Sequence, residues 1–239
     1  MSSFDIISEY YDTIISDRNI DSIYLDIFNT HVKDAKKVLD LGCGTGKFLS
    51  KIVTSEKIGV DISEQMIKQA RIKNPDCLFL KSDLRYLELK NQTYDFVVSM
   101  YDVINNIKKI EDWRKLFVNV YNSLNKNGIF AFDINTQERM ESVLKASPMI
   151  KVFGCDNFSI TIVKQINNSN SLFKWEHLLV VSRPNGNYVF KHMNNYELTP
   201  AIDDVYQILT KIFRKIDTVD IDKMSGGSIG GKKIFICFK

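Results

Sequence analysis

The stretch GCGTG at residues 42–46 places glycine at alternate positions, a pattern that can bind a ligand. It follows VLDL (38–41), which is typical of a short buried β-strand. Apolar residues recur at helical spacing from Phe48 to Ile52, so we expect a helix to begin at or just after the last glycine. Glycine permits unusual backbone dihedral angles and lets a ligand approach the chain closely. Strand, glycine turn and helix together indicate a nucleotide-type pocket.

The spacing of the glycines distinguishes between the kinds of ligand that such a pocket can bind. A P-loop has four residues between its glycines and a Ser or Thr after its lysine, whereas three residues separate Gly42 from Gly46 and Phe48 follows Lys47. A dinucleotide fold has the spacing G-x-G-x-x-G. An NAD or flavin site would also place pyrophosphate near Asp40, which would repel it. S-adenosylmethionine carries a sulfonium and an α-ammonium without phosphate, so the same carboxylate would attract it.

The elements that must position this turn follow in a regular rhythm. Short apolar runs at 57–63, 77–83, 94–102 and 128–135 are typical of strands, and stretches such as SEQMIKQARIK and WRKLFVNVYNSL lie between them with helical spacing. Strands that alternate with helices predict an α/β fold with a doubly wound, Rossmann-like and mostly parallel sheet. The first 33 residues are expected to form helices that precede the first strand.

The second half of the chain has a different pattern. Three runs alternate with period two and are separated by NNSN and RPNGN, which predicts an inserted antiparallel β lid at 145–197. The chain closes with KIDTVDID and KKIFICFK. The glycine-rich connection between them is too short for a crossover, so the last strand should be antiparallel. We expect a single domain, 1–239, with the lid inside it.

VLDLGCGTGKFL resembles the glycine motif of class I S-adenosylmethionine-dependent methyltransferases, and the resemblance extends from YYDTI to the closing hairpin. An antiparallel last strand is the topological mark of that family. The resemblance implies S-adenosyl-L-methionine as cofactor and a set of contacts at the strand ends. The expected cofactor-binding residues are Tyr11, Asp40, Gly42, Cys43, Gly44, Gly46, Asp61, Ile62, Met66, Ser82, Asp83, Leu84 and Met100.

Several of these residues have an expected role and an alternative. Asp61 ends the second strand, where a carboxylate can accept hydrogen bonds from both ribose hydroxyls, or it caps the following helix. The resemblance makes Ile62 and Met66 apolar faces for adenine, and it makes Asp83 the acceptor for the adenine amino group, with the Leu84 backbone N–H beside it. Asp83 could instead be a solvated loop residue. Met100 would lie at the methionine end. Tyr11 either closes over the cofactor or packs a helix.

The acceptor is less determined than the cofactor. The segment after the fourth strand, SMYDVINN, lacks the (N/D)-P-P-(Y/F/W) motif of enzymes that methylate DNA bases or glutamine, and no Cys beside Pro marks a cytosine C5 enzyme. YDVINNI resembles the same segment of small-molecule enzymes, including those that N-methylate amino sugars. Asn105 either lines the acceptor pocket or caps a helix.

The lid offers candidate catalytic residues. If Asn185 and Gly186 form a two-residue type I′ turn, Trp175 faces Tyr196 and the other paired residues are fixed by the same register. His177, His192 and Tyr196 would then share one aromatic face, which suits an amine acceptor because rings attract a cation and His can take its proton. The alternative is that this face only packs on the sheet.

Composition and charge narrow the function further. The net charge is +3 with scattered Lys and Arg, so nucleic acid is not expected as a partner. We expect no signal peptide, no membrane span and no metal site, and the four cysteines without CxxC spacing indicate a reduced cytoplasmic protein. The expected partner is a small-molecule acceptor methylated at nitrogen, and a homodimer is left open. The alternatives are an RNA or protein methyltransferase and a noncatalytic cofactor-binding module.

Overall fold

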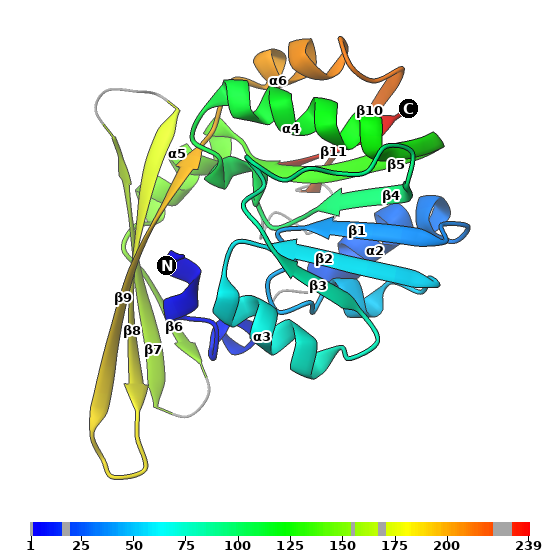
Figure 1. Ribbon diagram of the computed structural model, residues 1–239. Helices are drawn as coiled ribbons and strands as arrows, with labels where there is room; N and C mark the ends of the chain where they lie inside the picture. The colour runs from blue at the N-terminus through cyan, green and yellow to red at the C-terminus, as the bar shows by residue number, and fades with distance from the viewer. Residues whose placement is uncertain (1, 16–19, 154–155, 167–170, 222–230) are drawn as a thin grey trace.

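The structure is a computed structural model that describes residues 2–15, 20–153, 156–166, 171–221 and 231–239. Its main element is a seven-stranded sheet with the strand order β10-β11-β5-β4-β1-β2-β3 (Figure 1). The strands are β1 (Lys37–Leu41), β2 (Glu56–Asp61), β3 (Leu78–Lys81), β4 (Tyr94–Ser99), β5 (Leu124–Asn135), β10 (Lys215–Asp220) and β11 (Lys232–Phe238).

The sheet is parallel except for one strand. β1 pairs in parallel with β2 and β4, β4 with β5, and β2 with β3, whereas β11 pairs antiparallel with both β5 and β10. The fold predicted from the sequence is therefore confirmed, including the antiparallel last strand. The glycine-rich connection between β10 and β11 lies almost entirely outside the described residues.

Helices cover both faces of the sheet. The longer ones are α2 (Ile20–Val32), α3 (Glu64–Lys73), α4 (Ile110–Ser123), α5 (Gln137–Ala146) and α6 (Ile202–Leu209). Shorter helical segments are η1 (Ser3–Ile6), α1 (Tyr11–Ile15), η2 (Leu49–Lys51) and η3 (Ile104–Asn106). α4 and α6 lie on one side of the sheet and α3 on the other (Figure 1). The first 33 residues do contain helices before β1, as predicted.

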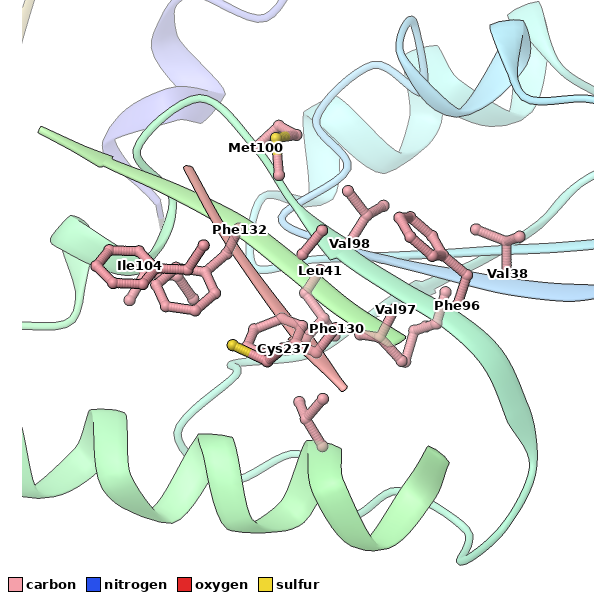
Figure 2. Close-up of a cluster of buried hydrophobic side chains, with 14 of the residues drawn as sticks. Val38, Leu41, Phe96, Val97, Val98, Met100, Ile104, Phe130, Phe132 and Cys237 are labelled. Atoms are coloured by element: carbon pink, nitrogen blue, oxygen red, sulfur yellow. The ribbon is translucent and has the colours of Figure 1, made fainter. Parts of the chain in front are cut away.

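The core consists of apolar side chains from the central strands. Phe130 and Phe132 of β5 point into it beside Val97 of β4 (Figure 2), and Phe117 of α4 lies over them with its ring centroid 5.0 Å from that of Phe132. The side chain of Phe28, which belongs to helix α2, also packs against the strands. All five of these side chains are at most 1% exposed. Burial of a Phe side chain contributes about 1.5–3 kcal/mol, so this core fixes the strands that carry the glycine turn.

The helix expected after the glycines is much shorter than predicted. Only the 3₁₀ turn η2 forms there, and β2 begins at Glu56. Val53 and Thr54 are β-branched residues that favour an extended chain before β2. The apolar spacing correctly indicated a buried face, since Phe48, Leu49 and Ile52 are all buried.

A second, antiparallel sheet stands beside the first. It contains β6 (Met149–Phe153), β7 (Asn157–Gln165), β8 (Leu172–Ser182) and β9 (Tyr188–Leu198) in that order. The N-terminal segment 2–15 lies between this sheet and α3 (Figure 1). Ile7 packs there against Met66 of α3 and against Leu179 and Met193 of the second sheet. The two sheets are therefore connected through the N-terminal segment.

The register predicted for the β8–β9 hairpin is wrong by one residue. Trp175 pairs with Asn195 and His177 with Met193, so Tyr196 and His192 lie on the opposite face. Arg183 N–H donates to the Asn187 carbonyl at 2.8 Å, and Gly186 N–H donates to the Arg183 carbonyl at 2.9 Å.

The physical reason for the shift is Pro184. A two-residue loop at Asn185-Gly186 would require Pro184 to donate an N–H to Asn187, and proline has none. The chain instead forms a three-residue loop in which Pro184 takes the second position of a type I turn. Gly186, with φ of 78°, takes the left-handed position that closes it.

Candidate functional site

A cavity of about 600 Å³ lies between the carboxyl ends of the parallel strands and the inner face of the second sheet. The N-terminal segment covers it through Phe4, Ile7, Tyr11 and Ile14. The glycine turn, the segments after β2, β3 and β4, the end of β5 and helix α5 complete its wall. Ligands bind at this edge in open α/β sheets, so the cavity is where the topology places a binding site.

The three glycines of the turn differ in what requires them. All have positive φ: 79° at Gly42, 53° at Gly44 and 74° at Gly46. A Cβ at Gly42 would approach Val103 Cγ1 to 2.4 Å, and one at Gly46 would approach the Asn74 side chain to 2.8 Å, so these two are required by the protein's own packing. Around Gly44 only the Tyr11 ring comes near, at 3.8 Å. The backbone at Gly44 is therefore open to a ligand in the cavity.

Asp61 anchors this turn and lines the cavity. Its Oδ2 accepts a hydrogen bond from Gly44 N–H at 2.9 Å, and its Oδ1 accepts one from Ser63 N–H at 2.8 Å. Ser63 caps α3, since its hydroxyl accepts from Met66 N–H at 3.1 Å. The alternative role of Asp61 as the helix cap is thus filled by Ser63. Burial raises the pKa of Asp61 although both N–H groups oppose the shift.

Asp40 is placed differently from the expectation. It lies within β1, is 3% exposed, and is not among the residues that line the cavity. Burial, together with the charge of Asp61, raises its pKa to about 8. The carboxyl therefore holds its proton at neutral pH, and the argument that a negative charge at Asp40 attracts a cationic ligand does not hold for this structure.

Asp83 and Leu84, which follow β3, line the cavity. Tyr11, Ile62 and Met66 also line it. The Asp83 carboxylate is paired with Arg85, whose Nη2 donates to Oδ2 at 2.5 Å, and this hydrogen bond lowers the pKa of Asp83. The remaining expected cofactor residues lie behind this wall and do not line the cavity: Cys43, Gly46, Ser82 and Met100. Met100 is part of the core in Figure 2.

The second sheet contributes one of the three predicted catalytic residues. His177 lines the cavity, its Nδ1 lies 2.9 Å from the Thr161 hydroxyl, and its ring is nearly parallel to that of Trp175. His192 is exposed on the opposite face, and Tyr196 lies there under Lys108, whose Nζ is 4.4 Å from the ring centroid. The prediction that the three share one face is wrong because of the hairpin shift.

Two residues of the cavity wall were missed from the sequence. Glu197 of β9 is 3% exposed, and its Oε2 accepts a hydrogen bond from Asn135 Nδ2 at 2.8 Å. Burial, with a contribution from Asp102, raises the pKa of Glu197 to about 8. Asn135 ends β5 at the ligand-binding edge and could have been found from that position. Glu197 could not have been found from the sequence, because the hairpin register determines which face of the second sheet its side chain lies on.

Asn105 holds this part of the wall together without lining the cavity. It is fully buried, accepts from Asn135 N–H at 3.0 Å, and donates to the carbonyls of Asn135 at 3.2 Å and Leu198 at 2.8 Å. The sequence left two roles open for Asn105, a pocket residue or a helix cap. In the structure it has neither role. Asn105 joins the ends of β5 and β9.

A buried ion cluster fixes the segment after β4. Lys232 contacts Asp102 and lies 2.8 Å from Asp133 Oδ2, which also accepts a hydrogen bond from the Tyr24 hydroxyl at 2.5 Å. Asp102 N–H donates to Asp133 Oδ1 at 2.8 Å. Tyr101 and Asp102 have φ of 66° and 56°, a conformation that costs each non-glycine residue about 1–3 kcal/mol. The cluster offsets this cost and holds both residues at the cavity.

Comparison with known proteins agrees with this geometry. Residues 38–128 match the methyltransferase domain family. The putative methyltransferase YqeM of Bacillus subtilis (strain 168) is 31% identical over 116 residues, 46% of this chain and 47% of that protein. The dTDP-3-amino-3,4,6-trideoxy-alpha-D-glucopyranose N,N-dimethyltransferase of Streptomyces venezuelae is 29% identical over 89 residues, 36% and 37% of the two chains. The chain spans about half the length of the curated relatives it matches.

The fold gives the same class. The solved structure of an S-adenosylmethionine-dependent methyltransferase from Clostridium acetobutylicum ATCC 824 superposes with a TM-score of 0.77 at 22% identity, over 96% of this chain and 95% of that one. The match over residues 38–128 and the fold of the whole chain thus both resemble those of S-adenosylmethionine-dependent methyltransferases. No helix in the described part of the chain is long and apolar enough to cross a membrane.

Proposed function

We propose that this protein is an S-adenosylmethionine-dependent methyltransferase that acts on a small molecule, at nitrogen. The observation that carries the proposal is the contact of the Asp61 carboxylate with Gly44 N–H at 2.9 Å, at the edge of the cavity. The contact sets a carboxylate beside an exposed backbone turn, and no basic side chain is contributed by the turn itself to receive a phosphate. A neutral ribose and a cationic methionine end suit this arrangement.

The residues of the wall fit the parts of that cofactor. Asp61 uses one lone pair of each oxygen for a backbone N–H, so each oxygen can accept a further hydrogen bond from a ribose hydroxyl. Ile62 and Met66 provide apolar surface for adenine. Arg85 donates to both oxygens of Asp83, so an adenine amino group that bonds to this carboxylate would have to replace one of the Arg85 hydrogen bonds. When bound, the cofactor supplies a methyl group on a sulfonium, which a nucleophile displaces as the electron pair stays on sulfur.

The rest of the cavity supports a small acceptor. Clefts of about 300–1,000 Å³ are typical of small-molecule sites, and the N-terminal segment and the second sheet form two walls of this one. A relative named as an N,N-dimethyltransferase of an amino sugar nucleotide supports nitrogen as the methylated atom. The net charge of +3 gives little support to an RNA acceptor. We also propose a cytoplasmic location, since Cys43, Cys77 and Cys237 are free thiols.

The test is calorimetry with S-adenosylhomocysteine, S-adenosylmethionine and NAD, followed by incubation of a small-molecule library with the cofactor. We expect binding of both sulfur compounds, no comparable binding of NAD, and products that are heavier by one methyl group. Tight binding of NAD alone would refute the assignment. Cofactor binding without any methylated product would favour the noncatalytic module, and salt-dependent tRNA binding with methylated RNA would favour the RNA enzyme.

A further inference from the structure

Asn135 and Glu197 form a polar pair in the half of the cavity that the cofactor residues do not use. Along the strand ends, Asp83 follows β3 at one side of the row, and Asn135 closes β5 at the other. β4, β1 and β2 lie between them, and β1 leads into the glycine turn. The inner face of the second sheet adds Glu197 next to Asn135, with Trp175 and His177 on the neighbouring strand. This half is therefore where an acceptor can reach the methionine end.

The pair presents hydrogen-bond acceptors to the cavity. Asn135 Nδ2 donates to Glu197 Oε2, so Asn135 Oδ1 points away from the carboxylate. Asn135 is 2% exposed, and within the described part of the chain its Oδ1 has no hydrogen-bond partner. A buried carbonyl oxygen without a donor costs about 1–3 kcal/mol, which a ligand donor would recover. Both side chains line the cavity, so the missing donor is expected to come from a ligand.

The charges around the pair favour a cation. Asp102 from the segment after β4, Asp133 from β5 and Glu197 from β9 supply three carboxylates, whereas Lys232 from β11 and Arg139 from α5 supply two cations. Lys232 is already in contact with both Asp102 and Asp133. When Glu197 is ionised, above its pKa of about 8, the group has one more carboxylate than cations, and a cationic ligand near Glu197 would balance that charge and favour the ionised form.

We propose that Asn135 and Glu197 bind the amino group of the methyl acceptor and that Glu197 accepts its proton; this rests on the proposed function. A hydroxyl group has one O–H and can satisfy only one of the two acceptors. A primary ammonium has three N–H donors and can satisfy both. Asn105 is a positioning residue here, because it fixes the backbone of Asn135 and of Leu198, the neighbour of Glu197.

The proton and electron pair balance in this scheme. The ammonium nitrogen gives one proton to a Glu197 oxygen and keeps its lone pair. That pair forms the bond to the methyl carbon, while the pair of the breaking carbon–sulfur bond stays on sulfur. The product is the methylated ammonium, and Glu197 returns its proton to water, so each turnover releases one proton. Burial already raises the pKa of Glu197 to about 8, close to the pH at which such an acid–base group is effective.

The test compares Glu197→Gln with Glu176→Gln. Glu176 lies on the neighbouring strand β8 but on the opposite face of the sheet, where it pairs with Lys174 at 2.5 Å, so it is a matched control. The probes are primary amines, with dTDP-3-amino-3,4,6-trideoxy-α-D-glucopyranose among them, and the alcohols in which hydroxyl replaces each amine. The readouts are methyl transfer by mass spectrometry, kcat/KM against pH, and calorimetry with S-adenosylhomocysteine.

We expect wild type to methylate amines and not the matched alcohols. Glu197→Gln should lower kcat/KM about 100-fold or more and remove its rise towards pH 8, while affinity for S-adenosylhomocysteine stays within about twofold. Glu176→Gln should leave all three readouts unchanged. Methylation of the alcohols, an unchanged pH profile in Glu197→Gln, or a wild type that binds S-adenosylhomocysteine but methylates no amine would overturn the inference. A wild type that does not bind S-adenosylhomocysteine would instead overturn the proposed function.

Discussion

Replacement of Asp61 by alanine separates its two tasks, holding the glycine turn and holding the cofactor. The variant removes the acceptor of Gly44 N–H and that of Ser63 N–H, which lie 2.9 and 2.8 Å from the carboxylate. It also removes the groups that we expect to accept hydrogen bonds from the two ribose hydroxyls. The same substitution should therefore reduce both stability and cofactor affinity.

The two effects differ in size. Each unpaired backbone N–H costs about 1–3 kcal/mol when buried, and because Asp61 borders the open cavity, water can replace part of the loss. We expect the free energy of unfolding to fall by about 2 kcal/mol. Hydrogen bonds to a charged group contribute about 1.5–3 kcal/mol each. Because water in the open cavity can replace part of the two that are lost, we expect cofactor binding to weaken by about 2–4 kcal/mol, or about 30- to 1,000-fold in Kd.

Asp95→Ala is the matched control. Asp95 Oδ2 likewise accepts from two backbone N–H groups, those of Lys36 at 2.9 Å and Lys37 at 3.0 Å, but it does not line the cavity. Both variants should unfold at lower urea concentrations than wild type, and calorimetry with S-adenosylhomocysteine should show a loss for Asp61→Ala only. Wild-type affinity in a folded Asp61→Ala protein would reduce Asp61 to an anchor of the turn.

Three further outcomes follow from the structure. His177→Ala should lower kcat/KM for the acceptor about tenfold while His192→Ala stays within about twofold of wild type, because only His177 lines the cavity; equal losses would contradict the observed register. Gly42→Ala should lower the free energy of unfolding by about 2–4 kcal/mol in urea titrations, since φ is 79° and a Cβ would meet a valine at 2.4 Å; unchanged stability would contradict this contact. The free energy of unfolding of the cofactor-free protein should fall as the pH rises from about 4 to 8, because Asp40 and Glu197, with pKa values raised to about 8, bind protons in the folded state that the unfolded chain has released. Glu197→Gln should make that decline shallower, and a steeper decline would refute the pKa assignment.

The part of the cavity wall that we propose for the cofactor was predictable because it depends on local sequence. Gly44 and Asp61 follow strands whose apolar runs are easily recognised, and parallel strands bring their ends to one edge. The acceptor half depends on pairings between distant residues. Replacing one hairpin register by the next moves every side chain to the other face, and the Asn185-Gly186 signal was overridden by the missing N–H of Pro184. Glu197 is at the cavity only because of that register.

The second sheet also has a consequence for how such enzymes diversify. The matched methyltransferase domain, residues 38–128, includes the strand ends at Gly44, Asp61 and Asp83, whereas Asn135 and Glu197 lie beyond its limit. Under the proposed function, the residues expected to hold the cofactor and those proposed to face the acceptor are thus encoded in separate stretches of the chain. A lineage can change its acceptor by substitutions or insertions in the second stretch while selection on the first keeps the methyl donor constant.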